Sequence, residues 1–181
     1  MPLALALGDG RAVDEEGFWE LIAAARDVST TATGQATWLE KELKSRSGAD
    51  EGQPGNAIRD FEQHFWTQMQ RAFRWDLWGV ASLVHGEGGH DVFLGFRAWL
   101  ISLGKERFEA ALADPDTLAD EVWPGATGLP LCYVGRKTWE GLFHSELPTP
   151  TLDLFVEPRG EPIKESDLAV RFPKVAAAMR G

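Results

Sequence analysis

Two stretches in the middle of the chain are apolar around almost the whole circumference of a helix, and they limit how the sequence folds more than any other feature. Residues 75–84 read WDLWGVASLV, with Asp76 as the only charge, and residues 92–103 read VFLGFRAWLISL, with Arg97 as the only charge. A helix that is apolar on all sides belongs in the interior of a protein. Both stretches are well short of the roughly 20 apolar residues that span a bilayer. We therefore expect two buried central helices and no membrane partner.

Helical spacing of apolar residues continues through most of the remaining chain. Residues 57–74 carry their apolar side chains on one side, namely Ile58, Phe61, Phe65, Met69 and Ala72, which is typical of an amphipathic surface helix. Turn-forming residues predict a surface loop at 47–56. Prolines and glycines between 148 and 163 exclude regular helix and predict an irregular, Pro-rich C-terminal wrap. The predicted fold class is all-α, with an N-terminal extension at 1–13 and a single helical domain at 14–181.

Charge and cysteine content exclude several classes of function. The chain has 181 residues, of which 28 are acidic and 18 are basic, giving a formal net charge of -10. Because affinity for phosphate backbones and anionic lipids comes largely from Lys and Arg, no nucleic-acid partner is expected. The single cysteine, Cys132, cannot form an internal disulfide, so we expect a reducing, cytoplasmic location and a buried, unreactive thiol.

One short motif resembles that of a known family. Residues 73–79 read Phe-Arg-Trp-Asp-Leu-Trp-Gly, and further similar segments lie at 18–26, 96–120 and 160–177. The sequence resembles a bacterial, mainly actinobacterial, family of unknown function marked by this motif. The resemblance implies an almost wholly helical soluble domain and no established activity. Relatives typically have a Gly-Gly-Cys-type loop after the motif, whereas this chain reads HGEGGH, so no role that depends on that cysteine applies here.

The two lone charges suggest a candidate site. A buried charge must be paired, so we expect Asp76 and Arg97 to approach each other where their helices pack. The pair would either fix the register of the helices or line a pocket that binds an anionic group. In the second case, the remaining pocket residues would be Trp75, Trp78, Trp99 and His85.

A weaker candidate is the glycine-rich turn between the two apolar stretches. His85, Glu87, His90 and Asp91 lie within seven residues and offer nitrogen and oxygen donors. Their spacing matches none of the known zinc motifs. We expect a solvated turn with a helix cap, no metal and no cofactor.

The remaining signals favour binding over catalysis. Six acidic residues and one basic residue lie between Glu106 and Glu121, and Trp38 and Trp123 are the tryptophans least tied to a predicted core. No nucleotide-binding loop, nucleophile elbow or metalloprotease motif is present. The leading hypothesis is a non-enzymatic protein-binding or regulatory module that recognises another protein through this acidic face and exposed indoles. The alternative is an enzyme or small-molecule-binding protein with a Trp-lined pocket around Asp76 and Arg97, which takes a small anionic ligand.

Overall fold

The computed structural model describes residues 12–48, 55–86, 88–152 and 157–181. In this part of the chain the secondary structure is helical and contains no strand, so the fold is a single all-α domain, as predicted. Residues 1–11 of the predicted extension and residues 49–54 of the predicted loop lie outside the described residues. None of the described helices is long and apolar enough to cross a bilayer.

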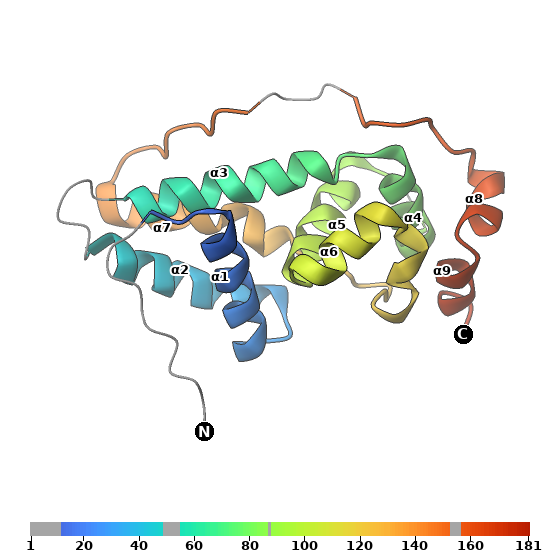
Figure 1. Cartoon of the computed structure of the whole chain (residues 1–181), viewed down its shortest axis with the longest axis horizontal. Coiled ribbons are helices and arrows are strands. Elements are labelled where there is room, and N and C mark those ends of the chain that lie inside the picture. Colours follow the sequence, from blue (N-terminus) through green and yellow to red (C-terminus); the bar gives the residue numbers. More distant parts are fainter. Residues whose placement is uncertain (1–11, 49–54, 87, 153–156) are drawn as a thin grey trace.

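Four helices form a bundle at one end of the molecule (Figure 1). They are α1 (Glu15–Val28), α2 (Ala32–Gly48), α3 (Asn56–Arg71) and α7 (Val134–Phe143). The apolar side predicted for residues 57–74 is confirmed, because its five members are all 0% exposed. The bundle therefore closes over the apolar side of α3.

The other end of the molecule is built around α5 (His90–Ser102). This helix packs against α4 (Trp75–His85), α6 (Lys105–Ala113) and η2 (Leu129–Tyr133), and also against the first three helices. Eight of its 13 residues are buried. The residues after Asp114 form a 3-10 helix, η1 (Pro115–Asp120).

A close backbone contact holds the loop after η1 against α5. The Gly128 N–H donates to the Gly95 carbonyl at 2.8 Å. A Cβ atom added to Gly128 would lie 2.2 Å from the Trp99 backbone nitrogen, which is closer than any real Cβ contact. The loop can therefore approach the helix only because residue 128 has no side chain.

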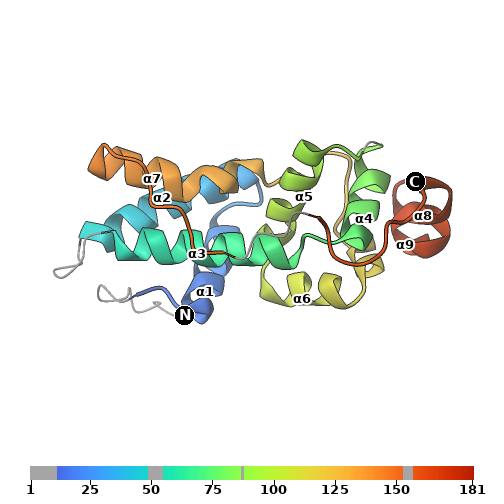
Figure 2. The ribbon, with the colours of Figure 1, turned by 90° about the horizontal axis from the view of Figure 1, so that it is seen from above.

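After α7, residues 144–152 leave the bundle end above α3, and residues 157–164 lie towards the opposite end of the molecule (Figures 1 and 2). The Gln63 side chain donates to the Thr151 carbonyl and accepts from the Thr151 N–H, each at 2.9 Å. Further along, Arg159 and Arg74 form a parallel β-bridge. These bonds tie the segment to the middle of α3 and to the start of α4.

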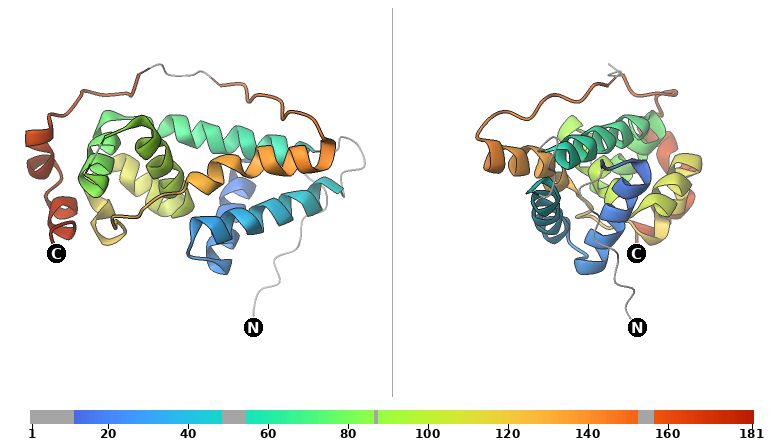
Figure 3. Two further views of the ribbon diagram at one scale, coloured as in Figure 1. Left: turned by 180° about the vertical axis from the view of Figure 1, so that it is seen from behind. Right: turned by 60° about the vertical axis from the view of Figure 1, so that its left-hand side comes forward.

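The chain finishes with two short helices, α8 (Glu165–Arg171) and α9 (Pro173–Ala178), beside α4 (Figure 3). Asp116 of η1 is buried, and its carboxylate accepts from the backbone N–H groups of Lys174 and Val175 at 2.9–3.2 Å. Asp116 thus caps the start of α9 from a distant part of the chain.

Candidate functional site

Five of the six predicted pocket residues line four separate cavities. Asp76 lines a cavity of about 890 Å³, and Trp75 and Trp78 line a neighbouring one of about 400 Å³. Trp99 lines a third and His85 a fourth. The structure therefore distributes the predicted site over several surfaces.

Asp76 is paired with Arg74 rather than with Arg97, which corrects the predicted ion pair. The Arg74 guanidinium donates to both carboxylate oxygens of Asp76, through Nε at 3.0 Å and through its second terminal nitrogen. Asp76 also accepts from the Leu77 N–H at 2.8 Å in the first turn of α4. No hydrogen bond or ion pair joins Asp76 and Arg97, although the structure describes both residues. Arg74 and Asp76 are separated by one residue, and this short spacing lets them pair locally.

Arg97, the sixth residue, lies among aromatic rings. Its guanidinium carbon is 4.7 Å from the ring centroid of Phe73 and 4.9 Å from that of Phe93. One terminal nitrogen donates to the Met69 carbonyl at 2.9 Å, whereas the buried Nε has no partner. Burial lowers the pKa of Arg97 to about 10, so the side chain is still charged at neutral pH. Ring faces and a carbonyl, rather than a carboxylate, stabilise this cation.

The glycine-rich turn brings together no metal site in the described residues. His90 packs edge-on against the Trp78 ring, with centroids 4.9 Å apart. His85 packs edge-on against Phe96, and its buried Nε2 has no hydrogen-bond partner. Glu87 lies outside the described residues. Gly89, rather than His90 or Asp91, occupies the cap position of α5.

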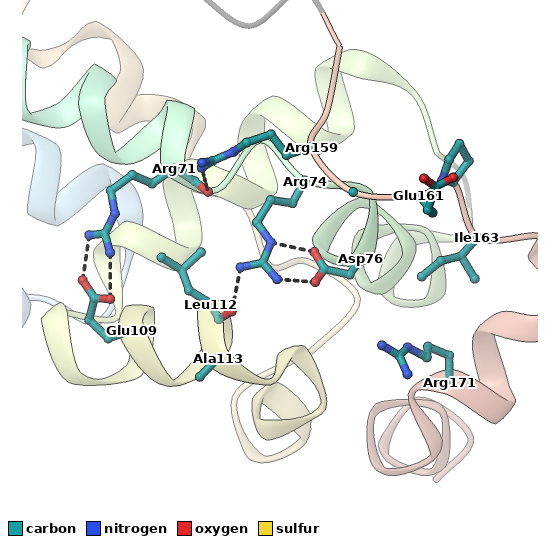
Figure 4. Close-up of a pocket in the computed structure, with 12 residues that line it drawn as sticks. Arg71, Arg74, Asp76, Glu109, Leu112, Ala113, Arg159, Glu161, Ile163 and Arg171 are labelled. Carbon is teal, nitrogen blue, oxygen red and sulfur yellow. Dashed lines mark hydrogen bonds and ion pairs between the residues drawn. The ribbon is translucent and has the colours of Figure 1, made fainter.

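The cavity that contains Asp76 is rich in arginine, and we call it the Arg cavity (Figure 4). One wall comes from the ends of α3 and α6 and the start of α4. The other comes from the C-terminal segment and α8. Its lining residues are Arg71, Arg74, Asp76, Glu109, Leu112, Ala113, Arg159, Gly160, Glu161, Pro162, Ile163 and Arg171.

Two arginines on the first wall are held in fixed positions. Arg71 forms two parallel hydrogen bonds with Glu109, at 2.7 and 2.8 Å, and these bonds raise the pKa of Arg71. Arg74 is held by Asp76 and also donates to the Leu112 carbonyl at 2.6 Å. Bidentate pairs of this kind fix the plane of the guanidinium group. The first wall therefore presents oriented cations.

The second wall adds two more cations. Arg159 donates to the Arg71 carbonyl at 2.9 Å. Arg171 is exposed, makes no side-chain hydrogen bond or ion pair with any described residue, and points into the cavity (Figure 4). Four arginines against Asp76, Glu109 and Glu161 give the lining a formal charge of +1. The cavity is thus locally positive in a chain whose net charge is -10.

The acidic stretch from Glu106 to Glu121 is largely engaged inside the molecule. Glu109 pairs with Arg71, and Glu121 pairs with Arg107. Asp114 caps η1, and Asp116 caps α9. Glu106 and Asp120 are the two acidic residues of this stretch with no side-chain partner in the described part of the chain. Docking of a protein partner through this acidic face stays a prediction.

Comparison with known proteins places the chain in a family. The model of a family described as "Protein of unknown function (DUF4240)" matches residues 13–140, which is well over half of the chain. The chain belongs to the DUF4240 family. Membership in a family of unknown function, as the sequence predicted, is confirmed. No curated protein and no solved structure matches the chain. The DUF4240 match covers the first wall of the Arg cavity, and the second wall lies beyond the matched residues.

Sequence reasoning missed most of the Arg cavity. Arg71 lies just before the tryptophan motif and Arg74 lies within it, but no local signal links them to Arg159 or Arg171. Only the path of the C-terminal segment joins the two groups, and no periodic pattern in the sequence specifies that path.

Proposed function

We propose that this DUF4240 protein is a binding protein whose Arg cavity takes a small anionic ligand. The observation that carries the proposal is Arg171, a cation that has no side-chain partner among the described residues and points into a cavity whose other arginines are already oriented. A ligand carboxylate or phosphate would supply the acceptor that Arg171 lacks. Arginine suits such groups because its planar fork can donate two parallel hydrogen bonds.

The size and lining of the cavity support a small-molecule ligand. Its volume of about 890 Å³ lies within the roughly 300–1,000 Å³ usual for small-molecule sites. Among the described residues, the apolar lining comes from Leu112, Ala113, Pro162 and Ile163 and includes no aromatic ring. These residues favour a compact or aliphatic anion over one that is bound by ring stacking.

The same lining favours binding over catalysis. In the part of the chain that the structure describes, it contains no Ser, Thr, Cys, His, Lys or Tyr to act as a nucleophile or neutral base. Two of its three carboxylates, Asp76 and Glu109, are committed to arginine partners. These assignments support a binding role for the cavity.

A direct test is calorimetric titration of the protein with acetate, citrate and pyrophosphate at low and raised salt. We expect affinity to rise with ligand charge and Arg171→Gln to weaken it roughly 10- to 100-fold, the value of one charge-assisted hydrogen bond. Arg180→Gln is the matched control, since Arg180 is exposed and does not line the cavity. Absence of binding to all three anions, or equal weakening by both variants, would overturn the proposal.

A second candidate function is docking of another protein, and one observation supports it. Trp123 is 55% exposed, beside a cavity of about 450 Å³ that it lines with Arg26 and Trp99. Exposed indoles are common anchors in protein interfaces. A partner that binds the wild-type protein should be lost from Trp123→Ala and retained by Trp38→Ala, because Trp38 packs against the core. Equal loss from both variants would argue against docking at Trp123.

A further inference from the structure

A second cavity lies at the bundle end of the molecule, where the C-terminal segment leaves α7. It has a volume of about 340 Å³. We call it the Glu62 cavity, and its lining residues are Glu62, Arg136, Glu140, Glu146, Leu147, Pro148, Thr149 and Pro150. It shares no lining residue with the Arg cavity.

Glu62 lines this cavity although it is only 8% exposed. Its Oε1 accepts from the Trp66 indole N–H at 2.8 Å. Its Oε2 accepts no hydrogen bond from any described residue. This oxygen is not fully enclosed by protein atoms, so it can accept a hydrogen bond from a ligand in the cavity.

Gly135 makes room for this oxygen. A Cβ atom added to Gly135 would lie 2.1 Å from Glu62 Oε2 and 2.9 Å from its carboxylate carbon. The Glu62 carboxylate therefore rests directly on the backbone of α7. Its position is set by Trp66 on one side and by Gly135 on the other.

The one cation in the lining does not satisfy Glu62. Arg136 attracts Glu62 through its charge but forms no hydrogen bond with it. Instead, the Arg136 guanidinium lies 5.1 Å from the Tyr133 ring centroid and 4.0 Å from a Glu140 oxygen. Burial is the main cause that raises the pKa of Glu62, and the hydrogen bond from Trp66 acts in the opposite direction.

We infer that the Glu62 cavity binds a primary ammonium group at the end of an aliphatic chain, as in lysine. An ammonium group is compact and has three donors, and the cavity offers three carboxylates against one guanidinium. Glu62 Oε2 would accept one of these hydrogen bonds, with Glu140 and Glu146 at the rim. Leu147, Pro148 and Pro150 would pack against the methylene groups of the ligand.

The test compares N-acetyl-lysine amide with N-acetyl-norleucine amide, which has the same aliphatic chain without the ammonium group. Binding is followed by the NMR signal of the Trp66 indole N–H, which Trp66→Phe identifies. We expect only the lysine compound to shift this signal, in a saturable way. A lysine-containing peptide that binds more tightly than the amide would show that the natural ligand is a protein segment, and the reverse would indicate a free amine.

Three variants make the inference falsifiable. Glu62→Gln keeps an acceptor for Trp66 but removes the charge, and should weaken binding about 10-fold or more, as expected for a lost charge-assisted hydrogen bond. Gly135→Ala keeps the charge but displaces the carboxylate, and should also abolish the shift. Glu40→Gln, on α2 and outside the cavity lining, should leave binding unchanged. If the indole N–H signals of the other seven tryptophans are unchanged, the variant is folded. Equal shifts from the norleucine compound, or full binding by a folded Glu62→Gln, would overturn the inference.

Discussion

The pairing of Arg74 with Asp76 yields a prediction whose size can be worked out from the structure. Arg74 donates two hydrogen bonds to Asp76 and one to the Leu112 carbonyl, so it joins the start of α4 to the end of α6. Hydrogen bonds to charged groups are worth about 1.5–3 kcal/mol, and solvent weakens ion pairs that are partly exposed. The Arg74 and Asp76 side chains are 27% and 24% exposed. We therefore expect a coupling free energy of about 1–2 kcal/mol between them.

A double-mutant cycle measures this coupling. Urea unfolding of the wild type, Arg74→Ala, Asp76→Ala and the double variant gives four free energies of unfolding. Arg74→Ala alone should cost about 2–3 kcal/mol, because it also leaves the Leu112 carbonyl without its donor. Asp76→Ala should cost about 1–2 kcal/mol.

The pair formed by Arg136 and Glu140 is the control for this cycle. These side chains are 56% and 51% exposed and approach only to 4.0 Å. A surface pair of this kind couples by about 0.5 kcal/mol or less. A coupling between Arg74 and Asp76 no larger than that of the control would refute the reasoning that the bidentate, partly buried geometry makes this pair stronger than a surface pair.

Three further predictions concern single side chains. Gly128→Ala should lower the free energy of unfolding by more than about 3 kcal/mol, because the added Cβ would clash with the backbone of α5. Gly141→Ala should raise it by about 0.5–1 kcal/mol, because Gly141 lies in α7 and faces open space. Similar urea midpoints for the two variants would contradict this. Burial raises the pKa of Cys132 from 9.0 to about 11, so its thiolate fraction at neutral pH should be about 100-fold lower than usual. Alkylation by iodoacetamide should therefore be at least 100-fold slower in the folded protein than in urea-unfolded protein. Comparable rates would show that the thiol is accessible and ionised. The pKa of Glu62 in the folded protein is raised above its ordinary 4.5, so protonated Glu62 favours folding. This contribution to the free energy of unfolding is fully present below pH 4.5 and is lost as the pH rises through the folded-state pKa. Glu62→Gln should therefore be more stable than the wild type at neutral pH, with the difference shrinking towards acid pH in thermal unfolding; a constant difference would mean that Glu62 does not titrate on folding.

Much of the fold is readable from the sequence because burial leaves a periodic trace. Asp14 accepts from the Gly17 N–H as a helix cap should, and the apolar side of α3 is buried as its spacing predicts. The type of the 3-10 helix η1 could not be predicted from the sequence, because an N-cap followed by proline can start either an α-helix or a 3-10 helix.

The candidate site was harder to predict because it depends on which elements meet. The apolar stretches single out Asp76 and Arg97 as lone charges, but they contain no information on how α4 and α5 are rotated against each other. Arg74 lies two residues before Asp76, close enough to pair without any tertiary contact. Cation–π contacts with Phe73 and Phe93 remove the need for an acidic partner of Arg97.

The two-walled construction of the Arg cavity has a consequence for its dynamics. The second wall belongs to a C-terminal segment with two short helices, held by the bridge at Arg159 and by the cap from Asp116. Such a segment can detach locally at a lower free energy than the whole domain unfolds. An anion that contacts both Arg74 and Arg171 would have to be released before detachment, so it would raise the free energy of this local opening. Amide hydrogen exchange in α8 and α9 would then slow with ligand concentration while exchange in α2 stayed constant. The C-terminal segment would thus be the part of the protein whose local stability depends on whether the cavity is occupied.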